Sequence, residues 1–105
     1  MVQNTEKFNQ GLGLLNFEAY EEAIKCFQQD IKQNPNNLAS YHNIGLAETH
    51  LGIDKQDKEL LKSAIQNLEK AIKIAKELNY NGYPIAEANL EWAKDELAKL
   101  KSANS

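Results

Sequence analysis

Two glycines, Gly11 and Gly45, lie 34 residues apart and occupy the same place in two similar stretches of sequence. Small and large apolar residues follow each of them in a comparable order: Leu14, Ala23, Phe27 and Pro35 after the first, and Gly52, Ala64, Leu68 and Ala71 after the second. A period of this length is typical of helical hairpins, which bury their apolar faces only by stacking on one another. The spacing therefore predicts an all-α fold, an α-α superhelix of five antiparallel helices.

Helical spacing of apolar residues runs through almost the whole chain. We expect helices at about residues 4–16, 18–33, 38–51, 55–79 and 84–102. Pro35 is expected to end the second helix, because its ring fixes φ and disfavours a helical conformation at the preceding residue. Gly52 is expected to end the third helix in the left-handed conformation. The apolar stripe of the fourth helix is expected to end at Leu78.

The second hairpin is predicted to be longer than the first. Ala23 and Ala64 lie 41 residues apart, which is seven more than the glycine spacing. Seven residues make nearly two helical turns, so segment 53–59 can lengthen the fourth helix without rotating its buried face. We expect a single domain with one unit at 4–37, a second at 38–79 and a capping helix at 84–102.

At these positions the chain resembles a tetratricopeptide repeat protein. The family pattern sets an aromatic residue, Leu-Gly, a second aromatic residue, Ala, a large apolar residue and Pro in a fixed order. The matching residues are Gly11, Tyr20, Ala23, Phe27 and Pro35 in the first unit, and Tyr41, Ile44, Gly45 and Gly52 in the second. One departure is Glu48, which replaces the second aromatic residue of the second unit. The resemblance covers about residues 4–78 and implies a right-handed stack of hairpins that binds another protein on its concave surface.

The resemblance further implies that the first helix of each hairpin lines a concave groove. Thr5 and Ala39 lie on the expected inner faces, and the residues predicted to contact a partner are Phe8, Asn9, Leu12, Asn16, His42, Asn43, Leu46 and His50. A mixture of apolar side chains and neutral polar groups suits an extended peptide or an amphipathic helix. The alternative is that Phe8 and Leu12 contact the fifth helix or a second copy of the chain. A self-associating structural subunit is therefore the second hypothesis.

One branch of the family binds C-terminal carboxylates through charged donors. The matching positions here hold Phe8, Leu12 and Asn43, and only Asn43 fits that pattern. A carboxylate needs charged donors to offset its desolvation, so we do not expect this chain to bind such tails.

The sequence contains no arrangement typical of catalysis or metal binding. His42 and His50 lie eight residues apart on one expected helix, about two turns, which is too far to share one ion. The single cysteine, Cys26, cannot form an intramolecular disulfide, and no local motif would activate its thiol, so we expect it to fill space as a small apolar residue. We therefore expect a non-enzymatic protein without a metal or cofactor.

Charge and hydropathy restrict the partners further. The formal net charge is −3 and Lys is interleaved with Glu, so no basic stripe favours nucleic acid. No apolar run approaches the ~18 residues of a membrane span, and residues 1–10 lack the apolar stretch of a signal peptide. These features predict a cytoplasmic protein.

Trp92 lies off the main stripe of the last helix and is expected either to pack on the fourth helix or to mark an outward face that favours a dimer.

Overall fold

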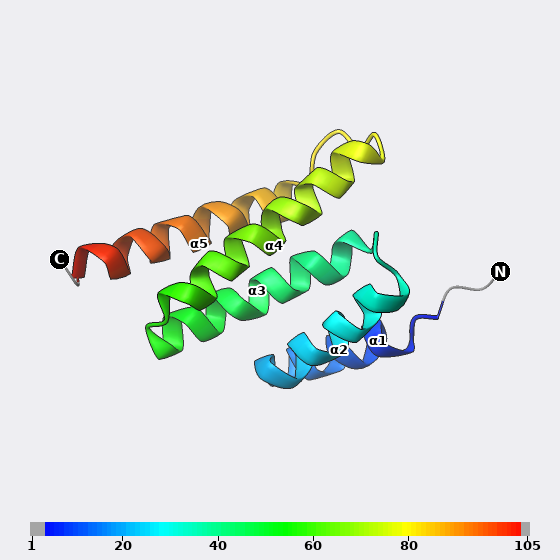
Figure 1. Cartoon of the computed structure of the whole chain (residues 1–105), viewed down its shortest axis with the longest axis horizontal. Helices are drawn as coiled ribbons and strands as arrows, with labels where there is room; N and C mark the ends of the chain where they lie inside the picture. The colour runs from blue at the N-terminus through cyan, green and yellow to red at the C-terminus, as the bar shows by residue number, and fades with distance from the viewer. Residues whose placement is uncertain (1–3, 104–105) are drawn as a thin grey trace.

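The computed structural model describes residues 4–103, which form five α-helices joined by short connections (Figure 1). The helices are α1 (Glu6–Asn16), α2 (Tyr20–Gln33), α3 (Leu38–Lys55), α4 (Lys58–Glu77) and α5 (Pro84–Ala103). Each helix packs against the next one along the chain, so that α1 with α2 and α3 with α4 form two hairpins and α5 covers α4. No strand occurs between residues 4 and 103. The predicted all-α fold of helical hairpins is confirmed.

Both hairpins depend on a glycine that allows their helices to approach closely. A Cβ atom placed on Gly11 would lie 2.8 Å from Cε1 of Phe27, and one placed on Gly45 would lie 2.6 Å from Cγ of Leu68. Phe27 and Leu68 are themselves completely buried. The two hairpins therefore repeat the same contact, between a glycine of the first helix and a large apolar side chain of the second, as the spacing predicts.

Gly52 does not end the third helix, contrary to the prediction. Helix α3 continues to Lys55, and Gln56 follows it in the left-handed conformation with a φ of 51°. Gly52 lies inside the helix, where a Cβ atom would lie 2.7 Å from Cγ of Leu61. This glycine therefore serves a third close contact between helices.

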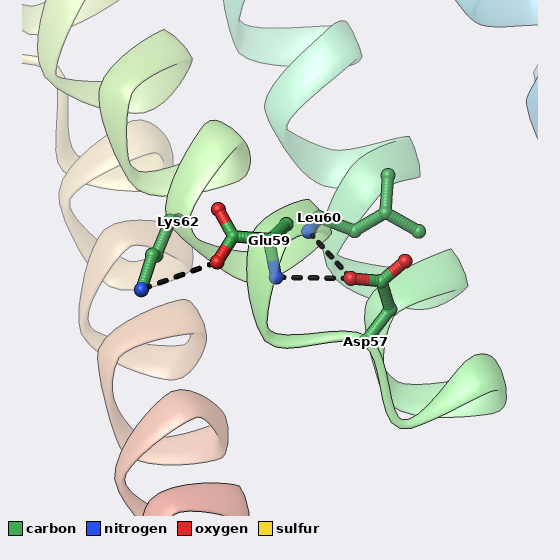
Figure 2. A network of polar contacts seen from close by, with 4 residues as sticks. All are labelled: Asp57, Glu59, Leu60 and Lys62. Carbon is green, nitrogen blue, oxygen red and sulfur yellow. Dashed lines mark hydrogen bonds and ion pairs between the residues drawn. The ribbon is translucent and has the colours of Figure 1, made fainter.

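The additional residues of the second hairpin lengthen both of its helices. Helices α3 and α4 have 18 and 20 residues, whereas α1 and α2 have 11 and 14. The second hairpin is longer than the first, as predicted, and because the turn at residues 56–57 lies within the expected insertion, the added residues extend α3 as well as α4. Figure 2 shows how Asp57 starts α4: its Oδ1 accepts hydrogen bonds from the backbone N–H groups of Glu59 and Leu60 at 2.9 and 3.2 Å. Such a cap satisfies donors that have no partner within the helix.

A buried carboxylate joins the two hairpins. Asp30, at the end of α2, is 1% exposed and accepts hydrogen bonds from Asn34 Nδ2 at 2.7 Å, Asn37 Nδ2 at 2.8 Å and Ser40 Oγ at 2.6 Å. Asn37 also caps α3 by accepting a hydrogen bond from the backbone N–H of Ala39 at 3.2 Å. Burial of a carboxylate is costly unless donors replace its water, and here three donors do so. The α2–α3 turn is therefore held in one geometry.

The glycine contacts can be tested with a pair of matched substitutions. We expect Gly45→Ala to lower the free energy of unfolding by about 1–2 kcal/mol, because overpacking costs about 1–3 kcal/mol while alanine regains up to about 1 kcal/mol of helix propensity. Gly13→Ala is the control, since a Cβ atom there meets no atom within 4 Å, and we expect it to raise stability by about 0.5–1 kcal/mol. Chemical denaturation measures both, and equal stabilisation by the two changes would contradict the close contact at Gly45.

Candidate functional site

The groove residues predicted on α1 fall into two classes. Phe8 and Leu12 are half-buried and pack against the apolar cluster of Ala23, Phe27 and Ile44, where the ring of Phe8 lies 5.8 Å from that of Phe27. Asn9 and Asn16 are exposed. Helix α1 therefore presents amide groups to solvent beside apolar side chains that are only partly covered.

The groove residues predicted on α3 are more enclosed. Asn43 and Leu46 are half-buried, and His42 is 8% exposed. The first turns of α5 and the loop before it cover His42, because Nδ2 of Asn89 lies 2.9 Å from His42 Nε2 and the ring of Tyr83 lies 5.4 Å away. A neutral imidazole with an unprotonated Nε2 accepts this hydrogen bond. His42 is thus engaged within the chain.

His50 lies between two aromatic rings. It stacks on Tyr20 of α2 with ring centroids 4.8 Å apart and planes within 4°, and the edge of Trp92 of α5 approaches it at 5.1 Å. Trp92 is half-buried and reaches α3, so neither expectation for it, packing on the fourth helix or facing outward, describes this contact. Helix α5 and the loop before it therefore contact α3 at His42 and His50, through aromatic rings and one hydrogen bond.

A hollow of about 600 Å³ opens at the end of the molecule where α1 and α3 begin. Three residues with predicted inner-face positions, Thr5, Phe8 and Ala39, line it. The rest of the lining comes from the α2–α3 turn and from the end of α4, which lie at the same end of the molecule (Figure 1). The structure thus brings part of the predicted groove together with segments that the sequence did not associate with it.

The sequence prediction missed Leu78 and Tyr80. Helix α4 ends at Glu77, so Leu78 lies beyond the apolar stripe on which it was expected. Leu78 and Tyr80 are 50% and 55% exposed, and both line the hollow. The sequence does contain a signal for this part of the site, namely Leu78 and the two tyrosines Tyr80 and Tyr83 near Gly82. Large apolar or aromatic residues in a loop are unusual unless they pack or bind.

Glu48, the departure from the family pattern, is buried between α3 and α4. Its Oε2 accepts a hydrogen bond from Ser63 Oγ and its Oε1 accepts one from Asn67 Nδ2, both at 2.7 Å. Burial raises the pKa of the Glu48 carboxyl above its ordinary value, and these two hydrogen bonds lower it in part. These contacts join the helices of the second hairpin, because Glu48 belongs to α3 and Ser63 and Asn67 belong to α4.

Residues 4–103 contain no group of three or more His, Cys, Asp or Glu side chains that could hold a metal ion. None of the helices in this range is long and apolar enough to cross a membrane. Comparison with protein-family models finds no match, and comparison with curated proteins finds no similar sequence.

The burial of His42 predicts a pH dependence of stability. Burial lowers the pKa of His42 below its ordinary value of 6.5, so the unfolded chain binds a proton first as the pH falls below 6.5. Stability is therefore fully present above that pH and decreases below it, by at most about 1.4 kcal/mol for each pH unit. Chemical denaturation at pH 7.5 and 5.5 measures the loss.

His42→Gln is the control for this prediction, because glutamine does not titrate. The variant should lose less stability between the two pH values than the wild type, while the contribution of Glu48 is common to both proteins. An equal loss in the two proteins would show that His42 is not responsible.

Proposed function

We propose that this chain is a non-catalytic protein-interaction module that resembles tetratricopeptide repeats and binds a peptide or helix of a partner protein along α1 and α3. The observation that carries the proposal is the hollow of about 600 Å³, where Thr5, Phe8 and Ala39, three residues with predicted inner-face positions, lie together. Concave surfaces with apolar and neutral polar side chains suit peptide recognition. The predicted cytoplasmic location is part of this proposal.

The repeated glycine contact supports the repeat assignment. Gly11 against Phe27 and Gly45 against Leu68 are equivalent contacts in successive hairpins, and short repeats of this kind are stabilised by their neighbours. Helix α5 packs on α4 through Ala93 and Leu90, in the manner of a capping helix. A preformed scaffold of this kind binds with little ordering of its own backbone, which reduces the entropy cost of association.

The character of the surface favours a foreign partner over a second copy. The exposed positions of α2 are all polar: Glu21, Glu22, Lys25, Gln28, Gln29, Lys32 and Gln33. Terminal units of repeat proteins need such polar outer faces to prevent further stacking. We therefore expect a single monomeric species in sedimentation velocity across a concentration series, and a mass that rises with concentration would favour the self-associating subunit.

The groove can be tested with a peptide library displayed on phage and selected on the full chain. We expect selected peptides to lose at least tenfold in affinity for Asn43→Glu, because a carboxylate would then lie beside half-buried apolar groups of the groove. Gln28→Glu is the control, since it also replaces an amide with a carboxylate, at an exposed position of α2. Fluorescence anisotropy measures the affinities, and thermal unfolding checks that both variants fold.

Two results would contradict the groove proposal. One is a selection that yields no peptide with measurable affinity for the wild-type chain. The other is a set of peptides that bind Asn43→Glu and Gln28→Glu equally well.

A further inference from the structure

The hollow is uncharged in a chain that is rich in charge. Asp, Glu, Lys and Arg make up 26% of the sequence, yet none of them is among the described residues that line the hollow. A charged ligand group would lose water there without gaining an ion pair, which is unfavourable. The lining therefore selects for an uncharged occupant.

One wall of the hollow is apolar and held in place. Leu78, Tyr80, Phe8 and Leu38 all line it, and a defined helix end fixes the first two. Asn79 adopts the left-handed conformation with a φ of 64°, and the backbone N–H of Tyr80 donates to the carbonyl of Ala75 at 3.0 Å. The left-handed residue and this hydrogen bond together form a Schellman motif, a common helix C-terminus. The two exposed apolar side chains are therefore presented by ordered backbone.

The lining also carries amides of two kinds. Asn34 and Asn37 are occupied, because both donate to the buried carboxylate of Asp30. The side chains of Gln33 and Asn36 make no hydrogen bond to any residue between 4 and 103. Each free amide offers both a donor and an acceptor, which is the pair of functions that a peptide backbone requires.

We propose that this hollow binds an extended peptide segment through one large uncharged apolar side chain, which packs among Phe8, Leu78 and Tyr80 while the free amides of the lining hydrogen-bond the peptide backbone. The inference rests on the proposed function and specifies where a partner is anchored and by what chemistry. Apolar contact supplies affinity, and the neutral lining discriminates against charged residues at the anchor position.

A second copy of this chain fits the hollow less well. Among residues 4–103, its most exposed large apolar side chain is Phe17, at 86%, and Glu18 follows directly in the sequence. Insertion of Phe17 would bring a carboxylate against the uncharged lining, with the desolvation cost described above. A peptide from another protein, free of flanking charge, carries no such cost.

The test is a titration of the isotope-labelled full chain with blocked pentapeptides, followed by nuclear magnetic resonance. The peptides are acetyl-Gly-Gly-X-Gly-Gly-amide with phenylalanine, glutamate or lysine at X. We expect the phenylalanine peptide to shift the backbone amide signals of Asn36, Leu38 and Tyr80, and to bind at least tenfold more tightly than the charged peptides.

Tyr80→Asp should weaken binding of the phenylalanine peptide at least tenfold. Ile85→Asp is the matched control, because Ile85 is also an exposed large apolar residue, at 59%, but does not line the hollow. That variant should bind as the wild type does. Similar shifts with all three peptides, shifts confined to other parts of the chain, or equal effects of the two variants would overturn the proposal.

Two further results separate this inference from the function on which it rests. Peptides selected in the phage experiment that respond to Asn43→Glu but not to Tyr80→Asp would leave the groove proposal standing and remove the anchor from the hollow. Self-association that Tyr80→Asp abolishes would assign the hollow to a second copy and overturn the peptide inference.

Discussion

The structure depends on how closely the two helices of each hairpin approach one another. At Gly45 the space that a Cβ atom would need is filled by Leu68, and at Gly11 it is filled by Phe27. Removing one methyl group from the first helix thus lets a large, fully buried side chain of the second helix reach the helix backbone. Packing of this density leaves little freedom to rotate or slide, because interiors fill space as closely as organic crystals do. The faces that remain outside the hairpin are fixed as a consequence.

Polar contacts add to the apolar cluster of Ala23, Phe27 and Ile44 in holding the two hairpins together. Asp30 collects donors from Asn34, Asn37 and Ser40, and Asn37 in turn starts α3. The carboxylate therefore couples the end of one hairpin to the beginning of the next. It also positions part of the hollow, since Asn34 and Asn37 are part of the lining. Replacement of Asp30 or Ser40 would therefore alter the geometry of the candidate site, although neither residue lines the hollow.

The sequence predicted the helices well because their stripes have a clear period. It predicted the glycine contacts for the same reason: the 34-residue spacing relates residues that occupy equivalent positions. It failed at Gly52, because a glycine near an expected helix end has two physical uses, a left-handed residue or a close contact, and the sequence alone does not distinguish them. The left-handed residue is Gln56 instead, and nothing in its chemistry marks it for that conformation.

The candidate site was only partly accessible to the same reasoning. Register placed Thr5, Phe8 and Ala39 on the inner faces, and the structure brings them together. Leu78 and Tyr80 join them only because α4 and the α4–α5 connection bring distant parts of the chain to one end of the molecule, which no local pattern encodes. The sequence marks Glu48 as a departure from the family pattern, but it does not reveal its partners, because Ser63 and Asn67 lie 15 and 19 residues away on the facing helix.

Helix α5 and the loop before it cover part of α3. Asn89 and Tyr83 contact His42, and Trp92 covers one side of His50, so that these two positions of α3 are already in contact with other parts of the chain. Helix α5 begins only at Pro84, and the connection before it turns away with Tyr80 more than half exposed. The start of α3 therefore remains open beside Tyr80. A peptide bound in the hollow as proposed would contact both hairpins, since Phe8 belongs to the first and Leu38 to the second.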